Sequence, residues 1–209
     1  MRAAAVSESA PAAPAILRAP LFADLIDRLD EHQRHVLLDL GPARAGLIER
    51  LGLLRCRLDI LDLPRQLAAL TRLATEDDSL PLKALLGECL PQANPEPIGI
   101  VLCWDLLDYL PPPATALLFS LLQSRLATGT RLHALVEYSA RQMPEQPRQI
   151  GPNLDGDLLI EAGAAGQAAA PRHSLASLAR FLPGFQSERS MLLGNGMQEY
   201  LFRFQGGPD

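Results

Sequence analysis

The sequence predicts a three-layer α/β domain with a doubly wound, mostly parallel sheet that ends in an antiparallel hairpin. Apolar runs of strand length alternate with amphipathic stretches of helical length, an order that builds a parallel sheet covered on both faces. The runs are apolar on both faces, as expected of strands buried on both sides. Near the C-terminus, two strand-like segments flank an Asn-Gly turn, which is a strong hairpin signal.

Composition limits the class of protein. The 209 residues suffice for one domain with a sizeable core, and 48% of them are hydrophobic. The net charge is -5 without a Lys/Arg-rich run, so nucleic acid is not expected as a partner. No apolar stretch approaches the roughly 20 residues that cross a bilayer. The three cysteines are widely spaced, so we expect no metal site, no disulfide framework and a cytoplasmic location.

The N-terminal half contains the first strand-and-helix alternation. Residues 1–19 are rich in Ala and Pro and predict a flexible tail, which leaves 20–205 as a single domain. Apolar residues recur at helical spacing over 21–29. Gly41-Pro42 ends the first strand, and Pro64 suits the first turn of a helix. The expected elements are strands at 35–40 and 55–61 and helices at 43–53, 64–75 and 80–90, with no convincing strand in 76–97.

The C-terminal half continues the alternation. Residues 98–104 are a continuous β-branched run, the clearest strand of the chain. A helical turn at 106–110, a helix at 111–127 that Gly129 ends, and a strand at 131–138 follow. Residues 139–172 are rich in Pro, Gly and Ala and too long for an ordinary connection, so they form either a functional lid or a mobile insert. The last elements are a helix at 174–181 and strands at 185–193 and 198–204.

The fold itself predicts where a ligand would bind. Ligands of open α/β sheets bind beyond the carboxyl ends of the strands, at the point where the strand order reverses. The positions that follow the expected strands are therefore the candidates, namely 39–46, 62–64, 103–109 and 137–143.

Three segments and the element order resemble the class I S-adenosylmethionine-dependent methyltransferases. VLLDLGPARAG (36–46) stands where that family has an acidic residue followed by Gly-x-Gly-x-Gly, and LDILDL ends in Asp62, 23 residues after Asp39. IVLCWDLLDYLPPPATALLFSLLQSRLATGTRLHALV (100–136) is similar to the family's fourth strand, next helix and fifth strand. The hairpin fits its sixth and seventh strands, and the resemblance covers roughly residues 34–205.

The resemblance implies S-adenosylmethionine as the cofactor and a set of site residues. Asp62 would grip the ribose hydroxyls, and Asp39 would orient the cofactor's ammonium group. Asp105 and Tyr109 are the catalytic candidates, without a firm assignment. The full set of implied cofactor-binding residues is Asp39, Gly41, Ala43, Asp62, Asp78, Cys103 and Trp104.

The loop departs from the family pattern. Its three glycines stand here as Gly41, Ala43 and Ala45, and the two methyl groups reduce the room for a close backbone approach. Pro42 removes one N–H donor. The third strand of the family is missing or obscure, and Asp78 and Ser79 are the candidates for the adenine contact.

Each candidate also has a structural interpretation. Asp39 satisfies N–H groups of the turn, and Asp62 and Asp105 cap the helical turns that follow them. Trp104 covers the core, and Cys103 acts as a small buried hydrophobe.

Three functions fit these observations. The leading hypothesis is a methyltransferase acting on an unknown small-molecule or protein acceptor, by proximity and orientation rather than by a catalytic triad. The alternative is an inactive methyltransferase-like scaffold or regulatory partner, a possible pseudoenzyme that binds a protein through an exposed apolar helix at 21–29. A Rossmann-type oxidoreductase ranks third, because GxGxxG is absent.

Overall fold

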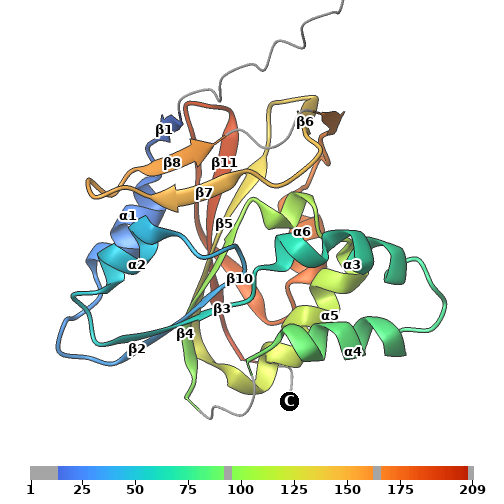
Figure 1. The fold of residues 1–209 in the computed structure, drawn as a ribbon, viewed down its shortest axis with the longest axis horizontal. Coiled ribbons are helices and arrows are strands. Elements are labelled where there is room, and N and C mark those ends of the chain that lie inside the picture. Colours follow the sequence, from blue (N-terminus) through green and yellow to red (C-terminus); the bar gives the residue numbers. More distant parts are fainter. Residues whose placement is uncertain (1–13, 92–95, 162–165, 207–209) are drawn as a thin grey trace, which may run out of the picture.

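The central sheet has six strands in the order β10-β11-β5-β4-β2-β3 (Figure 1). A computed structural model describes residues 14–91, 96–161 and 166–206 of the chain. Four neighbouring strands, β3, β2, β4 and β5, are parallel, whereas β11 runs antiparallel to β5, and β10 antiparallel to β11. The strands are β2 (His35–Asp39), β3 (Cys56–Ile60), β4 (Ile98–Trp104), β5 (Leu126–Glu137), β10 (Phe185–Leu192) and β11 (Met197–Phe204).

Helices cover both faces of this sheet, which confirms the predicted three-layer α/β class (Figure 1). One face carries α1 (Pro20–Asp27) and α2 (Ala45–Leu51). The other carries α3 (Leu67–Leu73), α4 (Leu80–Cys89), α5 (Pro112–Leu122) and α6 (Leu175–Phe181). Short 3-10 turns at Leu63–Gln66, Leu106–Asp108 and Gln123–Arg125 complete the connections.

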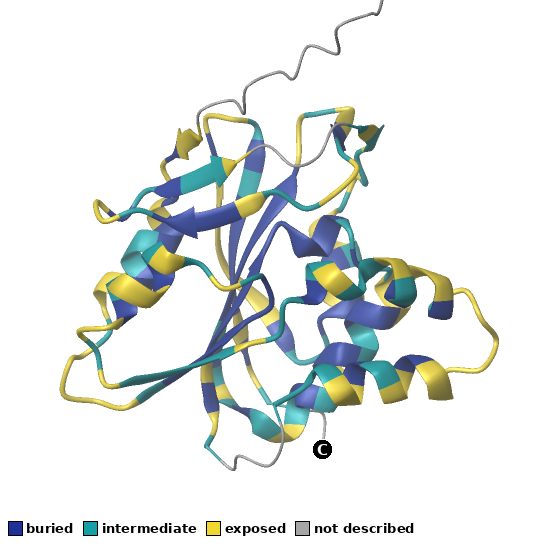
Figure 2. Cartoon of the chain, viewed as in Figure 1, coloured by how far each residue is buried: buried dark blue, intermediate teal, exposed yellow. Residues whose placement is uncertain are grey.

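The core is split by the sheet into two layers. Leu38 and Val101 point to the α5 side, while Leu37 and Leu102 point to the α1 side. β2 and β4 are therefore apolar on both faces, as the sequence predicted for them. Figure 2 shows the central strands buried, with exposed residues on the outer helix surfaces and along β10.

The N-terminal region differs from the prediction. Ala15–Leu17 forms a strand, β1, which pairs with β8 (Leu158–Glu161), so the predicted flexible tail 1–19 is wrong over these residues. Residues 1–13 lie outside the described part of the chain. The apolar residues of α1 are buried against the sheet. The predicted partner surface at 21–29 is therefore wrong, since this apolar face already packs on the core.

The described parts of the insert at 139–172 contact residues that follow β4, through Pro144 on Tyr109 and Arg148 on Asp105. The insert contains β6 (Gln142–Pro144), β7 (Gln149–Pro152), β8 and β9 (Gln167–Ala169). These strands form two small sheets, β1-β8-β7 and β6-β9, of which the first lies beside α1 and α2 (Figure 1). Its described parts are thus organised by backbone pairing, and α2 contacts β7.

Two details of the sequence prediction change. The helix predicted to reach residue 127 ends at Leu122, and β5 begins at Leu126. Gly129 does not end the helix, because its φ of +94° is accommodated inside the strand beside an irregularity in the pairing with β4. Between β3 and β4, the described residues contain helices but no strand, so β3 is the edge of the sheet.

Candidate ligand-binding site

The strand order reverses between β2 and β4. From β2 the chain continues to β3 on one side, and β4 later returns to the other side of β2. Asp39 ends β2 and Trp104 ends β4, so both residues lie at this reversal, where open α/β sheets bind their ligands.

Asp39 is a fully buried carboxylate. Its Oδ1 accepts the Gly41 N–H at 2.8 Å and the indole N–H of Trp104 at 2.6 Å. Its Oδ2 is buried and has no hydrogen-bond partner among the described residues. Burial raises the pKa of Asp39 to about 6, although the two hydrogen bonds act in the opposite direction.

Trp104 is held in an unusual conformation. Its φ is +51°, a left-handed value that bulky residues rarely adopt and that costs about 1–3 kcal/mol. The side chain is buried, and its ring packs on those of Phe22 and His133 with centroid distances of 5.6 and 6.4 Å. The interpretation of Trp104 as a core residue is therefore confirmed, and the bond to Asp39 adds a polar anchor.

The turn after β2 has little free space. A Cβ at Gly41 would lie 2.7 Å from Cδ1 and 2.9 Å from Nε1 of Trp104, so the indole occupies the room that this glycine leaves. At the start of α2, a Cβ on Gly46 would collide with the Pro152 carbonyl of β7. Ala43 is exposed and does not line the cavity described next.

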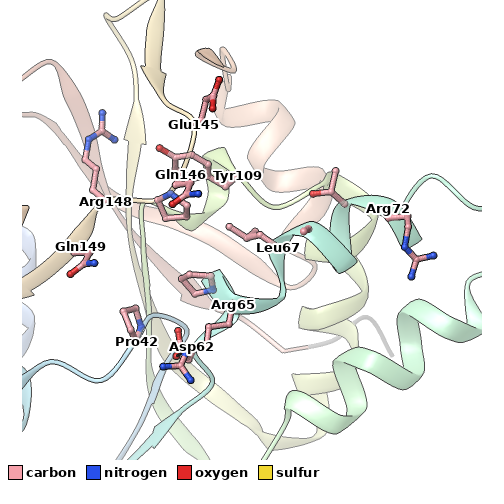
Figure 3. Close-up of a pocket in the computed structure, with 14 residues that line it drawn as sticks. Pro42, Asp62, Arg65, Leu67, Arg72, Tyr109, Glu145, Gln146, Arg148 and Gln149 are labelled. Atoms are coloured by element: carbon pink, nitrogen blue, oxygen red, sulfur yellow. Dashed lines mark ion pairs between the residues drawn. The ribbon is translucent and has the colours of Figure 1, made fainter. Parts of the chain in front are cut away.

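A cavity of about 830 Å³ opens beside this turn (Figure 3). Pro42, Asp62 and Arg65 lie toward one end, and Tyr109, Glu145 and Gln146 toward the other. The remaining lining comes from the 3-10 turn before α3, from α3 itself and from the insert: Pro64, Leu67, Ala68, Thr71, Arg72, Pro147, Arg148 and Gln149.

Asp62 stands at the end of β3 in a left-handed conformation with φ of +48°. Its side chain makes no capping hydrogen bond to the turn that follows, so the predicted capping role is wrong. Instead, Oδ2 of Asp62 pairs with Nε of Arg65 at 2.6 Å. Because the Arg65 side chain is 81% exposed, this pair is easily reorganised by a ligand.

Behind Tyr109, a buried ionic network ties the insert to the sheet. Asp105 Oδ2 accepts the Arg148 backbone N–H at 3.0 Å and its Nη1 at 3.3 Å, and Arg148 also pairs with Glu137. Asp105 thus anchors Arg148 rather than capping the next turn. Burial raises the pKa of Asp105 to about 6, while Arg148 lowers it.

Asp108 extends this network toward the far end of the insert. Its Oδ2 accepts the Glu137 N–H at 2.8 Å, and its Oδ1 lies 3.6 Å from Nε2 of His173. Burial raises the pKa of Asp108 to about 8 and lowers that of His173. Burial also raises the pKa of Tyr109, whose hydroxyl donates to the Pro144 carbonyl at 3.0 Å.

The sequence candidates fall into three groups. Asp62 and Tyr109 line the cavity. Asp39, Gly41, Cys103, Trp104 and Asp105 are buried beside or behind it and do not line it. Asp78 is exposed and accepts the Leu80 N–H at the start of α4, so the predicted adenine contact at Asp78 has no support in the geometry.

The residues that sequence reasoning missed come from the insert, from α3 and from the turn before α3. Glu145, Gln146, Arg148 and Gln149 line the cavity although they lie far along the chain from the strand-end loops. The available signal was the length of 139–172, which indicated either a functional lid or a mobile insert but not which residues face the site.

The two halves of S-adenosylmethionine fit this site unequally. The cavity offers the Asp62 carboxylate to a ribose diol, and its volume accommodates a nucleoside. In contrast, the Trp104 indole fills the space over Gly41 and uses Oδ1 of Asp39. The nucleoside half therefore fits the site as it stands, and the amino-acid half does not fit at Asp39 while the indole is there.

Neither a membrane-spanning helix nor a metal-binding cluster is found among the described residues. No helix within 14–91, 96–161 or 166–206 is long and apolar enough to cross a membrane. In the same ranges, no group of three or more His, Cys, Asp or Glu side chains is arranged to hold a metal ion.

Comparisons with known proteins give no family assignment. No protein-family model matches the chain, and no curated protein matches it. Among solved structures, a DhpI–SAH complex is 17% identical, with 90% of this chain and 81% of that chain covered and a TM-score of 0.47. The Burkholderia thailandensis 1,6-didemethyltoxoflavin-N1-methyltransferase is 16% identical, with coverages of 88% and 75% and a TM-score of 0.47.

The pyocyanin biosynthetic protein PhzM is 15% identical, with 88% of this chain covered and a TM-score of 0.44. The chain spans about half the length of PhzM and of the mitomycin 7-O-methyltransferase MmcR, 54% and 52% respectively. The strand order and the C-terminal hairpin are themselves those of a class I methyltransferase-like fold, without its third strand in the described residues.

Proposed function

We propose that this chain is an S-adenosylmethionine-dependent methyltransferase whose cofactor binds through its adenosine half in the Asp62 cavity. The observation that carries the proposal is the cavity itself. It lies at the carboxyl edge of the parallel strands and has Asp62 toward one end and Tyr109 toward the other.

Asp62 supplies the recognition chemistry. A carboxylate with two acceptor oxygens binds the two hydroxyl groups of a ribose in a bidentate manner. Asp62 is partly accessible, and within the described part of the chain its Oδ2 pairs with the exposed Arg65. A ribose can therefore compete with Arg65, because an exposed ion pair contributes little, about 0–1 kcal/mol.

The insert supplies enclosure. Arg148, bound to Asp105 and Glu137, holds residues 145–149 over the cavity, and the Tyr109 hydroxyl holds Pro144. When bound, the cofactor supplies an electrophilic methyl group. The chain's contribution is to orient cofactor and acceptor and to exclude water, which is how methyl transfer proceeds without a catalytic triad.

A second function, ligand binding without methyl transfer, is favoured by one observation. Asp105 and Asp108, two acids whose charges act on Tyr109, are committed to Arg148 and to the Glu137 N–H. Neither acid lines the cavity, so neither is available there as a base for the acceptor. A methyl-transfer assay with candidate acceptors separates the two functions once cofactor binding is established.

Isothermal titration with S-adenosylmethionine and its demethylated product tests the proposal. We expect binding in the micromolar range, accompanied by a thermal shift that corresponds to about 2.7 kcal/mol at a hundredfold excess over Kd. Asp62→Ala should weaken binding at least about tenfold while the fold is retained, since Asp62 caps no helix.

Asp78→Ala is the matched control. It removes an exposed aspartate outside the cavity, with the loss of one hydrogen bond to the Leu80 N–H. It should reduce stability by about 1 kcal/mol and leave affinity unchanged. Absence of binding at millimolar cofactor, or equal binding by the Asp62 variant, would contradict the proposal.

A further inference from the structure

We propose that Trp104 is a specificity-determining residue that occupies the ammonium-binding position at Asp39. A ligand that carries an α-amino-acid tail must then displace the indole, whereas a nucleoside need not. The inference rests on the proposed function, because it concerns the same site. It states that the amino-acid half of the cofactor, and not the nucleoside half, competes with Trp104.

The indole lies where a ligand is expected. The reversal of strand order places the binding crevice between the carboxyl ends of β2 and β4. Gly41 lacks the side chain that would close this crevice, and the Trp104 ring fills the space instead, with Cδ1 2.7 Å from the position of a Cβ there. Trp104 therefore occupies the space over Gly41 in which a ligand would be expected to bind.

The contact at Asp39 has the form of a ligand contact. The Trp104 N–H donates to Oδ1 at 2.6 Å, while Oδ2 remains buried without a partner among the described residues. An indole supplies one donor, whereas an ammonium group supplies three and carries the opposite charge to the carboxylate. An ammonium ligand thus satisfies Asp39 more completely than Trp104 does.

The backbone of Trp104 supports a displaceable state. A left-handed φ of +51° is unfavourable for a bulky residue and persists only while the surrounding contacts maintain it. Those contacts are the bond to Asp39 and the packing of the ring on Phe22 and His133. Once a ligand takes Asp39, one of these contacts is lost and the strain favours movement of the residue.

The experiment uses the intrinsic fluorescence of the full chain, in which Trp104 is the only tryptophan. Adenosine and S-adenosylmethionine are titrated separately, and Kd is measured for each by calorimetry. We expect adenosine to bind without a change in emission. S-adenosylmethionine should shift the emission to longer wavelength, because the displaced indole becomes more exposed.

Trp104→Phe provides the second measurement. It retains an aromatic ring against Phe22 and His133, and it removes both the donor to Asp39 and the five-membered ring that lies over Gly41. S-adenosylmethionine should bind the variant about tenfold more tightly, since no indole bond must be broken, with the Kd of adenosine unchanged within about twofold.

Binding of S-adenosylmethionine without any change in emission would overturn the inference alone, as would an equal effect of Trp104→Phe on both ligands. If neither ligand binds at millimolar concentration, the proposed function fails and the inference fails with it. The emission measurement needs no variant, so the inference stays testable even if Trp104→Phe does not fold.

Discussion

Two regions of this protein bury carboxylates, and they differ in how completely the oxygens are used. On the α1 side of the sheet, both carboxylate oxygens of Glu199 accept hydrogen bonds. Near the carboxyl ends of β2 and β4, three aspartates use only one oxygen in this way: Asp39, Asp105 and Asp108. Each of the three has one buried oxygen that accepts no hydrogen bond from the described residues, and that oxygen of Asp108 lies 3.6 Å from Nε2 of His173.

Glu199 joins elements that are distant in sequence. Its two oxygens accept the N–H groups of Leu21 at 3.1 Å and Phe22 at 2.8 Å, and Oε1 also lies 2.9 Å from Nε2 of His133. The N-cap residue of α1, Ala19, has no side-chain acceptor, so Glu199 supplies the cap from β11. This carboxylate is structural.

The three aspartates lie instead where a ligand or a lid is expected. Burial raises the pKa of Asp39 and Asp105 to about 6 and that of Asp108 to about 8, so each opposes stability when it is ionised. A satisfied acid stabilises a fold, and an unsatisfied one is retained at a cost, which indicates a role beyond stability.

The largest expected effect tests the structural side of this comparison. Glu199→Ala should reduce the free energy of unfolding by about 3–5 kcal/mol, because it leaves two N–H groups at the start of α1 and His133 without their acceptor. Urea denaturation measures the loss. The control is Glu188→Ala on β10, which breaks an exposed ion pair with Arg131 and should cost less than about 1 kcal/mol. Equal losses in the two variants would contradict the assignment.

The sequence predicted β2 and β4 well because these two strands are buried on both faces. The run at 98–104 coincides with β4, and the Asn-Gly turn lies between β10 and β11, since these patterns are local. The strand Ala15–Leu17 was not predicted, because it is formed by pairing with Leu158–Glu161, far away in the chain. The pattern at 21–29 shows an apolar helix face but not what covers it, and in the structure the sheet covers it.

The site was predicted only in part. Asp62 and Tyr109 follow strands, and the rule that strand ends bind ligands was enough to select them. Arg148 and Gln146 come from the insert, and no periodic pattern indicates which of its side chains face inward. The occupation of the Gly41 space by Trp104 depends on a backbone angle, which composition and spacing do not encode.

An intermediate effect, of opposite sign, is expected at Asp108. The pKa of Asp108 lies above its ordinary value of 3.8, so between pH 4 and 8 this group binds more protons in the folded state than in the unfolded state. The contribution of Asp108 to the free energy of unfolding therefore decreases as the pH rises from about 4 to 8. Asp108→Asn removes this decrease, because an amide oxygen still accepts the Glu137 N–H and the amide N–H faces His173. We expect a gain of about 2 kcal/mol at pH 8 and almost none at pH 4. Denaturant titrations at both pH values measure it, and a pH-independent change would contradict the assignment.

The smallest effect on stability, and the most informative one on function, is expected for Asp39→Asn. The amide oxygen keeps the bonds from Gly41 and Trp104, and the buried charge is removed. Removal of the charge stabilises the folded state. This stabilisation is offset because the amide NH2 takes the place of Oδ2, where it finds no hydrogen-bond acceptor among the described residues. The free energy of unfolding at pH 7 should therefore change by less than about 1 kcal/mol.

Ligand affinity should respond differently from stability. An amide cannot attract an ammonium group as a carboxylate does, so the Kd of S-adenosylmethionine should rise about tenfold in Asp39→Asn, while adenosine, held at Asp62, binds as before. Calorimetry with both ligands makes the measurement. If Asp39→Asn instead destabilises the chain as severely as Glu199→Ala and spares both affinities, Asp39 belongs with Glu199 among the structural acids. In that case, a buried oxygen without a hydrogen bond would not distinguish a ligand-binding carboxylate from a structural one.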